Sequence, residues 1–208
     1  HAAIATNKLS SCCGTSLATW RFIRAGLVNF RLAIPAVIAA IIGSSIGANL
    51  SLMVPEKIMI YILTGILPIA VFLVLNKKLF NDSGTDEITL DKRTYLTASI
   101  SAFIIGMYDG FYGPGTGTFL IIAFTVFANL SIKTANAQAK VINLTTNITS
   151  LCIFLFNGQV LFLLGIIAAI CNMAGGYIGA GLIMTNGAKI VKPSILFVLV
   201  LLAIKLFS

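Results

Sequence analysis

The 208-residue sequence predicts an all-α protein, a polytopic bundle of transmembrane helices. Hydrophobic residues make up 58% of the chain, charged residues only 10%, and the mean hydropathy is +1.02. A soluble domain carries about 25% charged residues. The segment from Leu32 to Pro55 contains no charged residue, so it can cross the ~30 Å hydrocarbon core of a bilayer. From Thr94 to Ile132 the only charged residue is Asp109.

The net charge of +8 does not indicate a nucleic-acid partner, because the basic residues are spread over the short gaps between apolar runs. Such positions are typical of residues that fix the orientation of membrane helices. The four cysteines, at positions 12, 13, 152 and 171, lie among apolar residues without the spacing of a metal site. The sequence contains no hydrolytic triad, phosphate-binding loop or metal motif. We therefore expect no enzyme and no cofactor, and the expected partners are the lipid bilayer and a small solute.

An internal repeat aligns the first third of the chain with the last third, without a gap, at an offset of 132 residues. Paired lysines and glycines inside apolar segments favour duplication over chance. The identical pairs include Lys8 and Lys140, Phe22 and Phe154, Gly26 and Gly158, Leu32 and Leu164, Ala36 and Ala168, Ile38 and Ile170, Gly43 and Gly175, and Gly47 and Gly179.

The second copy is preceded by a glycine-rich segment, Gly106 to Thr118, whose counterpart would fall before residue 1. If the two copies are equally long, about 40 residues precede His1 in the natural protein. The alternative is a lineage that has lost the first element of the repeat.

Apolar runs predict helices at residues 9–23, 33–53, 58–75, 95–110, 117–130, 141–157, 161–184 and 194–207. The hydrophilic stretch 76–93 separates a first transmembrane repeat, residues 1–75, from a second, residues 94–208. If residues 95–130 cross the membrane twice, 11 basic residues lie on the side of this linker and 3 on the other; a single crossing gives 8 and 6. The bias favours a cytoplasmic linker and inverted repeats, with parallel repeats as the alternative.

The glycine-rich segment contains five glycines and Pro114. A helix cannot continue smoothly through this proline and its neighbours. Broken backbone at membrane depth is tolerated where it is buried in protein or lines a cavity. A helix that restarts here would direct free N–H groups at that cavity, which suits an anion; a tight turn with close helix packing is the alternative. The candidate substrate-binding residues of this segment are Gly113, Gly115, Thr116, Gly117 and Thr118.

Asp109 lies beside this break. An unpaired carboxylate at the bilayer centre costs at least ~2.5 kcal/mol. We therefore expect Asp109 to act as a proton relay or to pair with Lys8 or Lys140, unless it is a solvated turn residue near the membrane surface.

Two polar stripes occupy matched positions in the two repeats. In lipid such stripes turn inward, where lysine and amide groups offer a path to an anion; hydrogen bonding between helices is the alternative for the uncharged residues. The stripes are Lys140, Asn143 and Asn147 in the second repeat and Lys8, Ser11 and Thr15 in the first, with Asn7 beside them. The glycines at 43, 47, 175 and 179 have the spacing of close helix packing and carry no chemistry.

Three motifs resemble those of the TauE/SafE family of sulfite and sulfonate exporters. They are Ala5–Thr15 (ATNKLSSCCGT), Arg21–Gly26 (RFIRAG) and Tyr108–Thr118 (YDGFYGPGTGT). Members usually carry a further glycine-rich segment before the Thr-Asn-Lys motif, and often polar or aromatic residues where this chain has Cys12 and Cys13.

The resemblance implies a secondary transporter of a bacterial-type inner membrane that moves a small anion, often a sulfur-containing one such as sulfite or a sulfonate. It leaves open a coupling proton or cation. An anion channel and a membrane scaffold that transports nothing remain as alternatives.

Overall fold

The computed structural model describes residues 1–55, 57–59, 61–62, 65, 90–186, 193–194 and 197. Most residues of the expected helices at 58–75 and 194–207, and almost all of the expected linker, lie outside this part. The all-α prediction is confirmed for the described residues, which contain no β-strand. Their helices are α1 (Ala2–Arg24), α2 (Phe30–Met53), α4 (Lys92–Phe111), α5 (Thr116–Phe127), α6 (Ile132–Phe156) and α7 (Phe162–Asn186).

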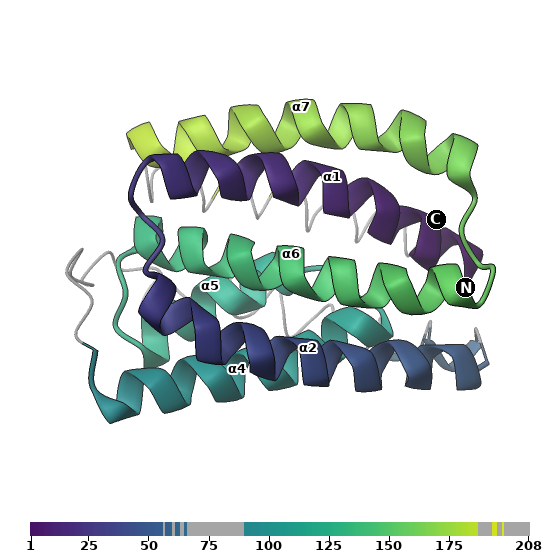
Figure 1. The fold of residues 1–208 in the computed structure, drawn as a ribbon, viewed down its shortest axis with the longest axis horizontal. Helices are drawn as coiled ribbons and strands as arrows, with labels where there is room; N and C mark the ends of the chain where they lie inside the picture. The colour runs from purple at the N-terminus through teal and green to yellow at the C-terminus, as the bar shows by residue number, and fades with distance from the viewer. Residues whose placement is uncertain are drawn as a thin grey trace.

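The long helices run roughly along one axis and form three layers (Figure 1). One layer contains α1 packed against α7, and the opposite layer contains α2 packed against α4. Between them, α6 contacts α1, α2, α4 and α5. The polar stripe of α6 therefore lies inside the bundle.

Three of the described helices have the length and composition of a membrane span: α2, α6 and α7, with mean hydropathies of 1.8, 1.4 and 1.8. Their outer surfaces are apolar, as shown by the exposed side chains of Ile34 in α2 and Ile166 in α7. Large apolar side chains that face outward along a whole helix suit lipid as the surrounding solvent.

Polar side chains cap the first turns of three helices. Asn29 accepts a hydrogen bond from the backbone N–H of Leu32 at the start of α2, and Ser131 accepts one at the start of α6. Asp91 accepts from the backbone N–H of Thr94 at 2.7 Å, and its hydrogen bonds with Thr94 lower the pKa of this carboxyl.

Two helices begin earlier than the apolar runs predict. α1 begins at Ala2 rather than residue 9, and α6 at Ile132 rather than residue 141. The additional turns carry polar residues such as Lys8 and Gln138 that face the interior of the bundle, where both are buried. Hydropathy therefore underestimates helices whose polar residues point toward protein rather than lipid.

α1 and α6, which the repeat pairs with each other, end in the same way. Gly26 and Gly158 have φ angles of +70° and +65°. The residue after each glycine donates its N–H to the carbonyl of a buried phenylalanine, Phe22 in α1 and Phe154 in α6, at 3.1 and 3.0 Å. This arrangement is the Schellman motif, and the left-handed conformation that it requires favours glycine.

Glycines bring the backbones of α2 and α4 into direct contact. A Cβ atom at Gly43 would overlap the carbonyl oxygen of Phe103, and one at Gly47 would overlap that of Met107. The expected close packing is therefore present in α2. It is absent at the repeat-related Gly175 and Gly179 of α7, where no described atom lies within 4 Å of such a Cβ.

Candidate functional site

The chain changes direction between α4 and α5, in the glycine-rich segment. α4 ends at Phe111 and α5 begins at Thr116. Gly113 and Gly115 have φ angles of +95° and +82°, in the left-handed region that glycine adopts without strain. Gly115 is the N-cap of α5 and provides no side-chain cap, so N–H groups of the first turn remain available to a ligand.

The length of α5 agrees with the expected position of this break at membrane depth. α5 has 12 residues, and 12 residues of α-helix rise about 18 Å, well short of the ~30 Å hydrocarbon core. α5 leads back toward the start of α6, where Lys133 lies at the end of the bundle that carries most basic residues of the described part of the chain. A helix of this length that ends near that surface begins inside the bilayer.

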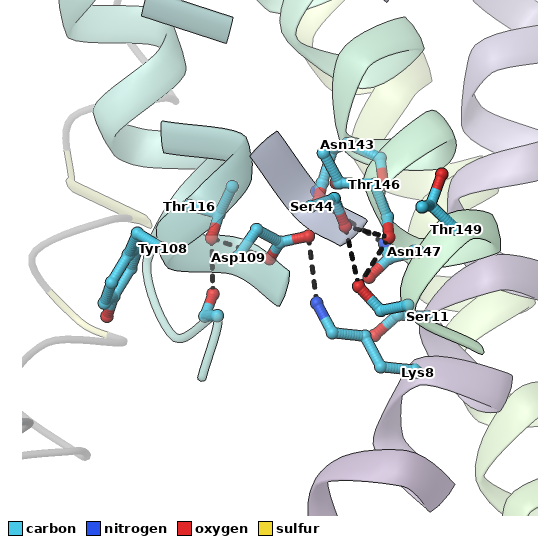
Figure 2. Close-up of polar contacts among 12 residues, drawn as sticks. Lys8, Ser11, Ser44, Tyr108, Asp109, Thr116, Asn143, Thr146, Asn147 and Thr149 are labelled. Carbon is cyan, nitrogen blue, oxygen red and sulfur yellow. Dashed lines mark hydrogen bonds and ion pairs between the residues drawn. The ribbon is translucent and has the colours of Figure 1, made fainter. Parts of the chain in front are cut away.

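Asp109, in the last turn of α4, forms a buried ion pair with Lys8 of α1 (Figure 2). The Lys8 Nζ to Asp109 Oδ2 distance is 2.9 Å, and each side chain is 3% exposed. The other carboxylate oxygen accepts a hydrogen bond of 2.7 Å from the Thr116 hydroxyl. Of the alternatives for Asp109, the solvated turn residue is wrong and the ion pair with Lys8 is present.

Tyr108 fixes the shape of the break. Its hydroxyl donates a hydrogen bond of 2.7 Å to the carbonyl oxygen of Pro114. Its ring meets that of Phe119 edge to face, with 5.7 Å between the ring centroids. These contacts join the end of α4 to the start of α5, so the turn is held by both flanking helices.

The two polar stripes face this break from α1 and α6. On α6, the Asn147 amide donates to the Asn143 side-chain oxygen at 3.3 Å. On α1, the Thr15 hydroxyl donates to the backbone carbonyl of Ser11 at 2.6 Å. Both hydrogen bonds are local to one helix, so these side chains do not join α1 to α6 directly.

Lys140 of α6 also lines the space between these helices. Among the described residues, the only salt bridge joins Lys8 to Asp109, so Lys140 has no carboxylate partner there. Lys140 is partly exposed. When its amine is protonated, the site carries a positive charge that no described carboxylate balances.

A pocket of about 210 Å³ collects these groups. Of the predicted site residues it includes Asn7, Lys8, Ser11, Thr15, Asp109, Gly113, Gly115, Thr116, Gly117, Lys140, Asn143 and Asn147. Thr118 does not line it, because successive residues of a helix point about 100° apart, and Thr116 and Gly117 occupy the side of α5 that faces the pocket. That any of these residues binds a substrate stays a prediction.

Two residues that the sequence did not single out also line the pocket, Tyr112 and Asn172. Tyr112 lies inside the glycine-rich segment. Asn172 of α7 donates its amide to the Ser10 hydroxyl at 3.0 Å. It is the one Asn or Gln side chain between residues 160 and 185. A single amide side chain in an apolar helix could have identified Asn172 as a candidate site residue. Comparison of the two repeats did not reveal it, because the repeat counterpart of Asn172 in α2 is the apolar residue Ala40.

Apolar helices around a buried polar pocket define a multi-pass helical membrane protein. The model of the family described as "Sulfite exporter TauE/SafE" matches residues 1–206. The chain belongs to this family, and it is a bacterial membrane transporter of the TauE/SafE type.

Curated relatives agree with this assignment. The chain is 33% identical to a "Probable membrane transporter protein ORF9" of a Sinorhizobium species, over 99% of this chain and 77% of that protein. It is 31% identical to a probable membrane transporter protein of Haemophilus influenzae, over 98% of this chain and 79% of the relative. For YfcA of Escherichia coli K12, also named a probable membrane transporter protein, the values are 31%, 98% and 75%. No solved structure matches the chain.

Proposed function

We propose that the protein is a secondary transporter that holds a small anion in the pocket between α1, α6 and the α4–α5 break. The observation that carries this proposal is the charge of the pocket. Lys8 is compensated by Asp109, whereas Lys140 has no carboxylate partner among the described residues. A pocket with one net positive charge favours an anionic occupant.

The neutral lining supplies further donors. Amide groups come from Asn7, Asn143 and Asn147, and a hydroxyl group from Ser11. The first turn of α5 adds backbone N–H groups and the positive end of its helix dipole. This donor set matches the oxygens of an oxyanion, which accept several hydrogen bonds at once.

The size of the pocket restricts the substrate. Its volume of about 210 Å³ lies below the range of about 300 to 1,000 Å³ typical of sites for drug-sized ligands. The family name specifies sulfite. We therefore propose sulfite or a short sulfonate as the substrate, because each presents a compact group of oxygens that these donors can surround.

Asp109 is the group through which a proton would be coupled to transport. A charged Asp109 carboxylate compensates the positive charge of Lys8. When the carboxylate is protonated, the Lys8 ammonium is available to contact the anion. Proton binding would thus raise the net charge of the pocket by one at the moment of loading. The variant Asp109→Asn is expected to weaken the dependence of flux on pH, and an unchanged pH profile would exclude this role.

The central experiment removes the uncompensated charge. Lys140→Gln keeps a long polar side chain but no charge, and hydrogen bonds to charged groups contribute about 1.5 to 3 kcal/mol, so sulfite affinity should fall by about 10- to 150-fold. Binding is measured by the thermal stabilisation of full-length purified protein with sulfite, sulfonates and carboxylates. Flux is measured in proteoliposomes.

Lys133→Gln is the matched control, because Lys133 lies on the same helix but does not line the pocket. Equal flux and equal anion stabilisation in wild type and Lys140→Gln would remove Lys140 from the site. Counterflow exchange of labelled sulfite against unlabelled sulfite is expected of a carrier. Flux without counterflow would indicate a channel instead.

A further inference from the structure

The hydroxyl group of Thr116, at the start of α5, makes two short contacts within the break (Figure 2). Its oxygen lies 2.7 Å from Asp109 Oδ1 and 2.7 Å from the carbonyl oxygen of Gly113. Thr116 is 2% exposed, and its hydroxyl has no third hydrogen-bond partner among the described residues. Both contacts have the usual length of an O–H···O hydrogen bond. Thr116 therefore joins the last turn of α4 to the turn that precedes α5.

Thr116 cannot donate a proton to both of these partners at once. A threonine hydroxyl carries one proton. The two acceptor oxygens lie in different directions from it, because they would otherwise overlap, and a strong hydrogen bond needs a nearly straight O–H···O angle. The carbonyl group of Gly113 has no proton to donate. If Thr116 donates to Gly113, the contact with Asp109 therefore needs a proton on the carboxyl group.

The hydrogen bonds of Thr116 thus depend on the protonation state of Asp109. A charged carboxylate only accepts, so the Thr116 hydroxyl then donates to Oδ1, and the Gly113 carbonyl keeps the backbone N–H of Thr116 at 3.2 Å. A carboxyl group protonated at Oδ1 donates to the Thr116 oxygen, and Thr116 then donates to Gly113. In neither state does Thr116 offer its proton to a ligand.

The charged and titratable groups around Asp109 come from three helices. They are Lys8 of α1, Lys140 of α6, and Tyr108 and Tyr112 at the C-terminal end of α4. α5 contains no titratable side chain, and the only one in α2 is Arg31, in its first turn. The described cysteines do not line the pocket. Asp109 is therefore the only carboxyl group among the described residues that line it.

We propose that Thr116 is a positioning residue that transmits the protonation of Asp109 to the start of α5. This inference rests on the proposed function, because it concerns the regulation of the same anion site. Protonation moves the hydroxyl proton of Thr116 from Oδ1 to the Gly113 carbonyl, which then accepts two hydrogen bonds from Thr116 and fastens the first turn of α5. One proton thus frees the Lys8 ammonium and fixes the N–H groups of α5 together.

Infrared difference spectroscopy of the full-length protein tests the hydrogen bond itself. The C=O stretch of the protonated Asp109 carboxyl group is the band that appears on acidification and is absent in Asp109→Asn. Thr116→Val keeps the shape of the side chain but has no hydroxyl, so this band should shift to higher wavenumber, whereas Thr116→Ser should keep the wild-type band. The same band in wild type and Thr116→Val, or no Asp109 band at any pH, would overturn the proposal.

The pH dependence of anion binding tests what the hydrogen bond does. Methanesulfonate is the probe, because its charge stays constant where carboxyl groups titrate, and its binding is measured by thermal stabilisation of the purified protein. Wild-type affinity should differ by about 5-fold or more between the two states of Asp109, the lower end of typical coupling between sites. Thr116→Val should lose most of this factor and Thr116→Ser should retain it. An unchanged factor in Thr116→Val would refute the positioning role.

Thr125→Val is the matched control, because it removes a buried hydroxyl from the same helix outside the pocket. The infrared test needs no anion, so a protein that shows the Asp109 band but does not bind methanesulfonate would contradict the proposed function and not the role of Thr116. If Thr116→Val fails to fold, the wild-type spectrum decides. A band at the frequency of a carboxyl group without a hydrogen bond would exclude the contact with Thr116.

Discussion

At the scale of single residues, Asp109 and Lys8 have two roles that must be separated. The ion pair is buried, and removing one partner of such a pair leaves an uncompensated charge that costs about 3 to 5 kcal/mol. Loss of transport in Lys8→Ala would therefore not distinguish a residue that binds substrate from one that holds the fold. Removing both charges together distinguishes a role in substrate binding from a role in stability, because stability should recover and flux should not if Lys8 binds the substrate.

A double-mutant cycle makes this separation. Lys8→Met and Asp109→Asn are each expected to lower the melting temperature of the full-length protein, because each leaves a buried charge. In the double variant the melting temperature should recover. Sulfite flux should remain lost if Lys8 contacts the anion. Recovery of flux along with stability would assign the pair a structural role only.

The sequence predicted most of the residues that line the pocket, for a physical reason. Charged and amide side chains are costly in lipid, so each one in an apolar run marks a place where protein surrounds it. Lys8, Lys140 and Asp109 were identified in this way. Which lysine pairs with Asp109 was not predictable, because the choice depends on how α1 and α6 are placed around the α4–α5 break.

At the scale of elements, the break between α4 and α5 depends on glycine for two separate reasons. Gly113 has a positive φ, and a Cβ there would lie 2.8 Å from an Asp109 carboxylate oxygen and 3.1 Å from Lys8 Nζ. Gly158, at the end of α6, has a positive φ but no atom of a described residue within 4 Å of such a Cβ. A substitution at Gly158 therefore introduces backbone strain alone, whereas one at Gly113 introduces backbone strain and contact with the ion pair.

The variants Gly113→Ala and Gly158→Ala are both expected to lose about 1 to 2 kcal/mol of stability from the left-handed conformation. Only Gly113→Ala should also reduce anion stabilisation and flux, because its methyl group displaces the ion pair. Thermal unfolding measures the first effect and the proteoliposome assay the second. A Gly113→Ala variant with normal flux would mean that the geometry of the break does not matter for transport.

Helix boundaries were predicted less well than helix positions. Apolar runs located the centres of all the described helices, because lipid-facing residues must be apolar wherever the helix crosses. The first turns of α1 and α6 were missed because their polar residues face the bundle. The packing of Gly43 and Gly47 was predicted from spacing alone. Spacing does not show whether a partner helix is present, and no described residue packs against Gly175 and Gly179 in this way.

At the scale of the whole molecule, most basic residues of the described part of the chain lie at one end of the bundle. Figure 1 shows that α1 and α7 finish at the end where α2, α4 and α6 begin. These helix ends carry Arg21 and Arg24 of α1, Arg31 of α2, Lys92 and Arg93 of α4, and Lys133 of α6. Positive residues concentrate on the cytoplasmic side of membrane proteins, so this end is expected to face the cytoplasm.

Cysteine labelling tests this orientation. Asn129 lies between α5 and α6 at the basic end, and Asn157 lies between α6 and α7 at the opposite end; both are exposed. In a cysteine-free full-length background, Asn157→Cys is expected to react with a membrane-impermeant maleimide added to intact spheroplasts. Asn129→Cys should react only after the membrane is opened. The reverse pattern would contradict the orientation, and reaction of both in intact cells would contradict the α6 crossing.

The glycine contacts between α2 and α4 also limit how the protein can move. Because carbonyl oxygens of α4 sit where a side chain of α2 would otherwise be, these two helices cannot slide past each other without losing contact along their whole crossing. The Gly14 and Gly176 contact imposes the same restriction on α1 and α7. The pairs α2–α4 and α1–α7 are therefore expected to move as stiff units, and a movement that separates them would have to break the ion pair between Lys8 and Asp109.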